Sequence, residues 1–173
     1  GKGKLGLDIT INPFNYIKQG QSYIVLSYGI TNKINIHSYY SIPADGFDNY
    51  YLGLFNQFLK VKNVSLATAI GIRQYKKSHD SHLFFPQLLY TFNIYRDIKV
   101  GGSIVTIRKY KNNYKVLGTT RDVSIIFPII KSKKSKKLIE STNFCIGLFK
   151  PILWETITGN WHPTYSIDFI LNI

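Results

Sequence analysis

Apolar and polar residues alternate with a period of two along most of the chain, and this pattern constrains the fold more than any other feature. Between Leu5 and Ile11 the odd positions are aliphatic, and the even positions are Gly, Asp or Thr. Successive side chains of a strand point to opposite faces, so such a segment has one apolar and one polar face. No segment keeps a helical period, and no apolar run is long enough for a membrane-spanning helix. The pattern predicts an all-β protein.

The alternating segments are separated by clusters of Gly, Pro, Asn, Asp and Lys, which favour turns. The predicted strands cover residues 5–11, 21–30, 34–40, 50–59, 64–73, 82–94, 98–108, 122–130, 142–149 and 164–173. We expect residues 1–173 to form a single domain. The expected architecture is an up-and-down antiparallel β-barrel of about ten strands, within a range of roughly eight to twelve.

The connections between the predicted strands differ in length in a regular way. Those at 31–33, 61–63 and 95–97, after the second, fourth and sixth strands, are short, whereas those after odd-numbered strands are longer. The basic stretch 131–137 is an exception, since a short turn is expected there. Short turns at one rim and long loops at the other are typical of outer-membrane barrels.

The two faces of the strands differ in polarity. In the strand at 64–73, Val64, Leu66, Ile70 and Ile72 share one face, and small or polar residues form the other. A soluble barrel has charged residues outside and bulky apolar residues inside. A continuous apolar face opposite a small, polar face instead predicts lipid outside and a polar lumen. The alternative is a soluble, lipocalin-like barrel that binds an apolar ligand or an anionic surface.

Two segments resemble small bacterial outer-membrane β-barrel proteins. Residues 28–36 run from an aromatic-Gly pair through a tight polar turn into an alternating strand, and the C-terminal strand is similar to the signal that barrel-assembly machinery recognises. That signal consists of Tyr165, Ile167, Phe169, Leu171 and Ile173. Ile173 departs from the pattern, because an aromatic terminal residue is usual. The resemblance implies an outer-membrane location, with the lipid bilayer and the assembly machinery as partners, and it carries over no active site.

Several charged residues fall on the polar faces of their strands. They are Asp8, Arg73, Lys99, Asp122 and Asp168. A narrow barrel must compensate such charges internally, so we predict a network of ion pairs in the lumen. A selectivity filter or a proton path is the alternative.

Aromatic residues gather near the predicted strand ends. We expect a girdle at the membrane–water boundary, because amphipathic rings suit that region. Its expected members are Tyr40, Tyr51, Tyr90, Trp154, Trp161 and Tyr165. Ordinary cross-strand packing is the alternative for each of them.

No catalytic or metal-binding motif stands out, and no cofactor is expected. The spacing of His79 and His82 suits weak metal binding, but no third ligand is close in sequence, and we interpret this segment as a solvated loop. The only cysteine is Cys145, which excludes an internal disulfide. The enzymatic alternative is an outer-membrane lipid hydrolase, for which Ser81, His82, His162 and Ser166 supply residue types without a motif.

The net charge of +13 comes mainly from residues between the strands. Basic turns suit anionic lipid headgroups, which are further candidate partners, and they do not point to nucleic acid. The alternative is that they only keep the protein soluble and reflect a coding bias toward Lys, Asn and Ile. The sequence contains no methionine, even at position 1, and we expect that a secretory signal peptide has been removed. Together these features predict a non-enzymatic, porin-like membrane protein with a structural role or a role in handling small solutes or lipids.

Overall fold

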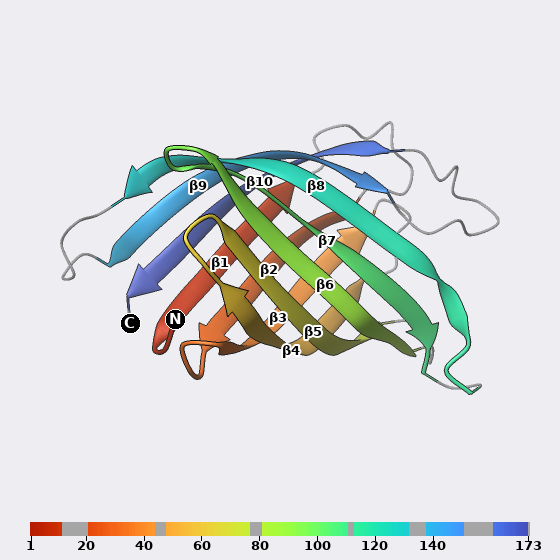
Figure 1. The fold of residues 1–173 in the computed structure, drawn as a ribbon. Coiled ribbons are helices and arrows are strands. Elements are labelled where there is room, and N and C mark those ends of the chain that lie inside the picture. The colour runs from red at the N-terminus through yellow and green to blue at the C-terminus, as the bar shows by residue number, and fades with distance from the viewer. Residues whose placement is uncertain are drawn as a thin grey trace.

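The computed structural model describes residues 1–11, 21–43, 48–76, 81–110, 113–131, 138–150 and 161–172. Within these ranges, ten strands close into a barrel (Figure 1). They are β1 (Lys4–Ile11), β2 (Gln21–Gly29), β3 (Ile34–Pro43), β4 (Asn49–Lys60), β5 (Val64–Tyr75), β6 (Ser81–Tyr95), β7 (Ile98–Lys109), β8 (Val116–Lys131), β9 (Ile139–Lys150) and β10 (His162–Asn172). No helix in the described ranges is long and apolar enough to cross a membrane.

Each strand pairs antiparallel with its neighbours in sequence, and β1 pairs with β10 to close the ring. This confirms the predicted up-and-down barrel and its strand number. The largest difference from the predicted bounds is β8, which begins at Val116 rather than at Asp122. The added residues include Gly118, Thr119 and Thr120, which do not alternate apolar with polar, but they pair with the end of β7. Backbone pairing therefore extends the strand where the side-chain pattern does not indicate it.

The two rims of the barrel are built differently, as predicted. At one rim, which we call the turn rim, short turns at 30–33, 61–63 and 96–97 join the strands. The first of these turns is held by Thr31, whose Oγ1 accepts hydrogen bonds from the backbone N–H groups of Lys33 and Ile34 at 3.1 and 2.9 Å. At the other rim, the loop rim, longer connections follow β1, β3, β5, β7 and β9. The basic stretch 132–137 lies outside the described residues.

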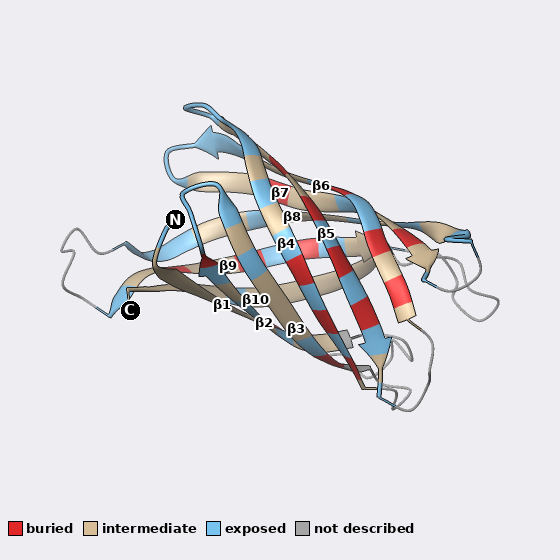
Figure 2. Ribbon diagram, turned by 90° about the horizontal axis from the view of Figure 1, so that it is seen from below, coloured by how far each residue is buried: buried red, intermediate tan, exposed pale blue. Residues whose placement is uncertain are grey.

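Exposed and more buried residues alternate along several strands, most clearly in β4 and β5 (Figure 2). In β4, Leu52 is 59% exposed whereas its neighbour Tyr51 is 3% exposed. The outward band includes Ile24, Leu26, Leu54, Ile70, Ile72, Ile146 and Leu148, all exposed. A barrel in water would hide such residues, so the band has the character of a lipid-facing surface.

The inner wall is densely packed along β3 to β8. Tyr51, Phe84, Val105 and Ile107 form a buried cluster, against which Tyr39 packs. The rings of Tyr39 and Tyr51 are stacked, with centroids 4.9 Å apart and an interplanar angle of 3°. Tyr51 lies over Gly53 and Gly71, where any added Cβ atom would collide with its ring. Two adjacent, directly paired glycines thus make room for the aromatic ring inside the barrel.

Candidate functional site

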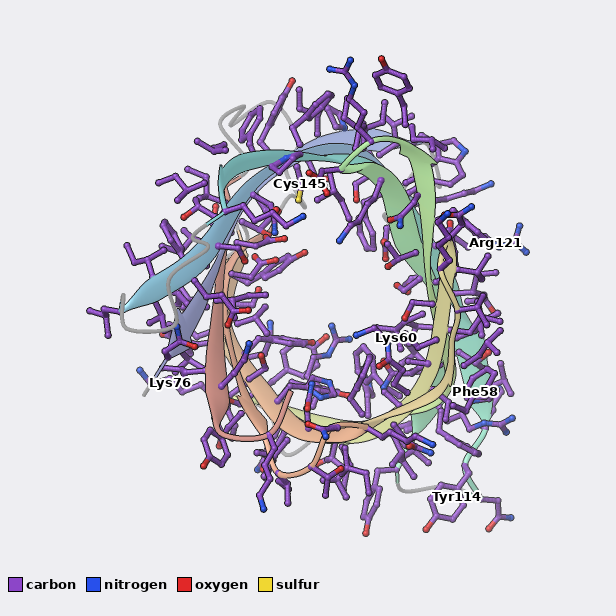
Figure 3. The ribbon with its side chains drawn as sticks, turned by 60° about the vertical axis from the view of Figure 1, so that its left-hand side comes forward. Phe58, Lys60, Lys76, Tyr114, Arg121 and Cys145 are labelled. Atoms are coloured by element: carbon purple, nitrogen blue, oxygen red, sulfur yellow. The ribbon has the colours of Figure 1, made fainter. Side chains whose placement is uncertain are left out.

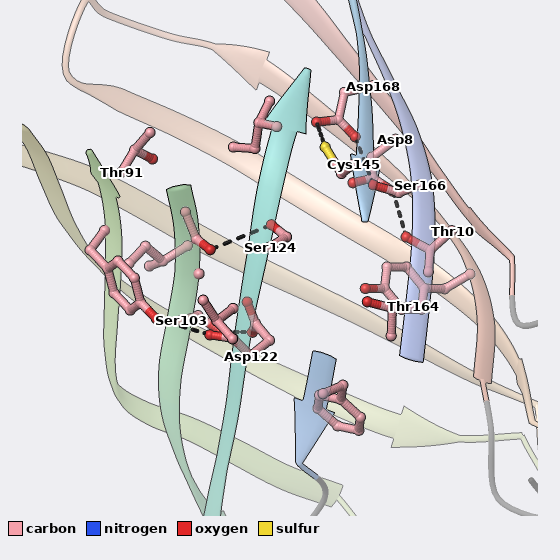
Figure 4. Close-up of a pocket in the computed structure, with 18 of the residues that line it drawn as sticks. Asp8, Thr10, Thr91, Ser103, Asp122, Ser124, Cys145, Thr164, Ser166 and Asp168 are labelled. Atoms are coloured by element: carbon pink, nitrogen blue, oxygen red, sulfur yellow. Dashed lines mark hydrogen bonds between the residues drawn. The ribbon is translucent and has the colours of Figure 1, made fainter. Parts of the chain in front are cut away.

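A cavity of about 500 Å³ lies inside the barrel (Figure 4). This volume falls within the range of small-molecule sites. Three carboxylates line it, those of Asp8, Asp122 and Asp168, and no Lys or Arg is among its described lining residues. Its remaining polar lining comes from hydroxyl groups, from Cys145 and from His162.

Two of the carboxylates meet at the seam between β1 and β10. Asp8 and Asp168 are direct partners in the antiparallel register, so their side chains share the inward face. The Asp8 Oδ1 atom accepts a hydrogen bond from the Thr10 hydroxyl at 2.9 Å. The Asp168 carboxylate accepts hydrogen bonds from the Ser166 hydroxyl at 3.2 Å and from the Cys145 thiol at 3.3 Å. Hydroxyl and thiol groups therefore donate hydrogen bonds to two carboxylates that lie directly opposite each other on paired strands.

The third carboxylate, that of Asp122, lies on β8, two strands from β10 around the ring. Asp122 on β8 accepts a hydrogen bond from the hydroxyl of Ser103, its direct partner on β7. Figure 4 shows Ser103 and Asp122 apart from the group formed by Asp8, Cys145 and Asp168. The cavity is therefore lined by carboxylates at two separate places.

Small side chains explain why the space is open. Ser65 and Ala67 on β5, Gly101 and Ser103 on β7 and Ser124 on β8 all line the cavity. They occupy the inward face of strands whose outward face carries the bulky aliphatic residues. The alternation recognised in the sequence therefore sets both the apolar exterior and the free volume inside.

Arg73 lies elsewhere on the inner wall. Its guanidinium carbon is 4.9 Å from the ring centroid of Tyr75 and 4.8 Å from that of Phe84, and its Nη2 atom lies 3.1 Å from Nδ1 of His82. The residue is 7% exposed. Aromatic faces and a histidine, rather than a carboxylate, are therefore the described neighbours of this cation.

The predicted ion-pair network is therefore not what the structure shows. Asp8, Arg73, Asp122 and Asp168 face inward as expected. Lys99 on β7 is the direct partner of Ile126 on β8, which faces inward, so Lys99 also lies on the inward face. The described ion pairs join Lys4 to Glu140, Lys76 to Asp48 and Lys131 to Asp97, and none joins two of the five predicted residues. Strand parity identifies the inward face correctly, but it does not show how far along the barrel axis each charge lies.

The predicted girdle residues divide between the two faces. Tyr40 and Trp161 are exposed near the loop rim, and Tyr165 lies on the outward face of β10. Tyr90 also lies on the outward parity, beside Phe92 and over Gly102, and its hydroxyl donates to the backbone oxygen of Asp122 at 3.1 Å. Its position is away from the strand end.

Tyr51 does not belong to a girdle. Its hydroxyl accepts a hydrogen bond from Nε2 of Gln87 at 2.9 Å and lies 3.1 Å from Nε2 of His37, inside the barrel. The prediction for Tyr51 was wrong because Tyr50 and Tyr51 are adjacent, and only one of two adjacent strand residues faces outward. Tyr50, 48% exposed, is the outward one. Trp154 lies outside the described residues.

The terminal-strand residues share one face. Ile167, Phe169 and Leu171 pair with Ile9, Leu7 and Leu5 of β1 on the outward side, and Tyr165 shares their face of β10. Ile173 lies outside the described residues. The apolar face of the predicted assembly signal is thus continuous with the outward band.

The residues considered for hydrolysis are not brought together. His82 contacts Arg73, and Ser166 donates to Asp168. His162 and Ser166 lie about 13 Å apart along β10 at the usual rise per residue. His79 lies outside the described residues, and the described residues contain no group of three or more His, Cys, Asp or Glu placed to hold a metal ion.

Sequence reasoning did not assign several cavity residues to the lumen, including Thr10, Ser103, Cys145 and Ser166. Thr10 and Ser166 share a strand face with Asp8 and Asp168, Ser103 is the partner of Asp122, and Cys145 is the partner of Ser166, so strand parity is the signal that identifies them.

No family model matches the sequence, and no curated protein matches it. Solved structures do match. A KdgM porin has a TM-score of 0.58 and 9% sequence identity, covering 98% of this chain and 99% of the porin chain. A KdgM porin in complex with disordered oligogalacturonate has a TM-score of 0.59, with the same identity and coverage. The chain thus has the fold of a small outer-membrane β-barrel, which confirms the predicted resemblance at the level of fold. Within that class, the chain is similar in structure to the porins named above.

Proposed function

We propose that this chain is a porin-like β-barrel of an outer membrane that takes small polar solutes into its lumen and catalyses no reaction. The observation that carries the proposal is the combination of a closed barrel, an exposed apolar band on its outside and a polar cavity within. A transmembrane barrel needs these three features together, because lipid surrounds it and water or solute fills it.

The polarity of the cavity argues against the lipocalin-like alternative. An apolar ligand would have to cover Asp8, Asp122 and Asp168 without offering them hydrogen bonds, and an uncompensated buried carboxylate is strongly unfavourable. Water or a hydroxyl-bearing solute satisfies them instead. The similarity to the porins named above supports the same choice of class.

The charge of the cavity indicates which solutes it accepts. Carboxylates at two places on the cavity wall attract cations, and with the neighbouring hydroxyl groups they hydrogen-bond to uncharged polyols, whereas they repel anions. We therefore propose uncharged or cationic polar solutes for this cavity. The outward face of β10 is the part of the chain that we propose the barrel-assembly machinery reads, with the lipid bilayer covering the rest of the band.

Extraction and permeation test the proposal in two steps. The chain should stay with membranes washed at high pH, dissolve only in detergent and migrate differently on gels before and after heating. Its recovery in the soluble fraction would rule out the membrane assignment. Vesicles that contain the folded protein should then swell in small uncharged sugars. Vesicles that stay impermeable, with a correctly folded barrel in them, would rule out solute passage.

A further inference from the structure

Two basic side chains lie directly opposite each other on the outside of the barrel. Arg121 of β8 and Lys150 of β9 are partners in the antiparallel register. Their parity is outward, since the next residues along these strands, Asp122 and Phe149, face the cavity. Figure 3 shows Arg121 pointing away from the barrel interior. Like charges in this arrangement destabilise a sheet unless something compensates them.

The described residues provide no such compensation. Neither Arg121 nor Lys150 belongs to any of the described ion pairs. The acid next to Arg121 in sequence, Asp122, faces inward and bonds to Ser103, and the acid nearest to Lys150 in sequence, Glu155, lies outside the described residues. An anion from outside the chain fits this arrangement, because it can lie between the two cations.

The level of the pair along the barrel identifies where such an anion would come from. The next outward residues toward the turn rim are Val123 and Leu148, which belong to the apolar band, and Lys150 is the last residue of β9. Lys150 therefore lies where the apolar band meets the loop rim on β9, whereas β8 continues beyond Arg121 toward that rim as far as Val116. Headgroup phosphates lie at this depth in a bilayer, and cationic side chains cost little there.

An aromatic residue borders the same place. Pro163 and His162 pair with Leu148 and Phe149, so continuing that register by one residue sets Trp161 beside Lys150. Trp161 is 46% exposed. An indole ring at the edge of an apolar band, with its N–H free to donate, suits the headgroup region.

We propose that Arg121 and Lys150 form a binding site for the phosphate group of a membrane lipid in the leaflet at the loop rim. The guanidinium supplies paired donors for the phosphate oxygens and the ammonium supplies a second positive charge. The proposal rests on the proposed membrane function, since it requires lipid around the barrel.

Lipid nanodiscs provide the test. The full chain is folded into nanodiscs of phosphatidylcholine with or without lipid A, a phosphorylated glycolipid, and retained lipid A is measured by mass spectrometry. The Arg121→Gln, Lys150→Gln double variant should bind lipid A about 30-fold more weakly than the wild type, as expected for two basic residues at an anionic surface. The Lys33→Gln, Lys62→Gln variant loses the same charge from exposed positions at the turn rim and should bind like the wild type.

Equal binding by all three proteins, or an equal loss in both variants, would overturn the site. Inorganic phosphate added to nanodiscs without lipid A should not raise the temperature at which the heat-modified band appears. A rise that requires Arg121 and Lys150 would overturn the assignment to a lipid. Failure of the chain to fold into any nanodisc would contradict the membrane function itself, and is thereby distinguished from failure of the site.

Discussion

Replacing Tyr51 with alanine removes the centre of the packed inner wall. The ring is stacked on Tyr39, lies edge-on to Phe84 with centroids 5.4 Å apart, and is 3% exposed. Truncating a buried aromatic side chain to alanine costs about 3–5 kcal/mol. Gly53 and Gly71 beneath the ring have no side chains with which to fill the space. We therefore expect the free energy of unfolding to fall by an amount near the top of that range.

The hydroxyl group of Tyr51 can be tested separately by the phenylalanine variant. Gln87 would lose the acceptor at 2.9 Å but would still donate to the backbone oxygen of Phe84 at 2.9 Å, and His37 would lose its neighbour. A partly satisfied buried group costs about 1–2 kcal/mol. Most of the alanine effect should thus come from the ring and not from the hydroxyl.

Urea unfolding of the barrel in micelles, followed by tryptophan fluorescence and by the gel shift, measures these differences. Tyr50→Ala is the matched control, because Tyr50 is the adjacent residue on the outward face and should cost about 1 kcal/mol. If the Tyr51 and Tyr50 alanine variants lose the same stability, the inner cluster does not stabilise the barrel as argued.

Three further predictions concern the cavity, a glycine and a surface ion pair. The Asp8→Asn, Asp168→Asn double variant should shift the reversal potential in planar bilayers toward lower cation preference. Asp97→Asn, at the turn rim, should leave the reversal potential unchanged. An unaltered reversal potential in the double variant would contradict the proposal that the cavity attracts cations. Gly102→Ala should lower the free energy of unfolding by about 1–3 kcal/mol, because the new Cβ would meet the backbone oxygen of Asp122 and the Tyr90 ring. Gly101→Ala should cost less in the same unfolding assay, because the nearest atom to its new Cβ is 3.0 Å away on the side chain of Ile126. The hydrogen bond and the charge of Lys131 lower the pKa of Asp97. The small contribution of this ion pair to stability is therefore complete above the ordinary aspartate pKa and is lost as pH falls through the lowered pKa. Lys131→Ala should raise the Asp97 pKa in an NMR titration, and an unchanged pKa would refute the pairing.

The sequence alone predicted most of the fold, because period-two alternation and short polar turns are local signals. It also placed Asp8, Arg73, Asp122 and Asp168 on the inward face. It did not show that Asp8 faces Asp168 while Arg73 packs against Phe84, because those contacts depend on strand register and on the stagger around the ring. That information is not local in the sequence.

The error at Tyr51 has a different cause. Leu52 and Leu54 set the outward parity of β4, and this parity assigns Tyr50 to the outside and Tyr51 to the inside. Nearness to the strand end suggested a girdle position for Tyr51. Where the two signals disagree, the parity of neighbouring aliphatic residues is the stronger, since the whole strand shares it.

The seam between β1 and β10 has a consequence for how the barrel forms. Nine of the ten strand pairs join neighbours in sequence and can form one after another as hairpins, whereas the seam joins residues from opposite ends of the described chain, such as Lys4 and Asn172. Long-range contacts of this kind are slow to form, because the chain loses loop-closure entropy before the new contacts can stabilise it. Asp8 and Asp168 become direct partners only when this seam pairs. The acidic pair is therefore complete only in the closed barrel, and the strand pairing with the longest separation in sequence is the one that brings the two carboxylates together.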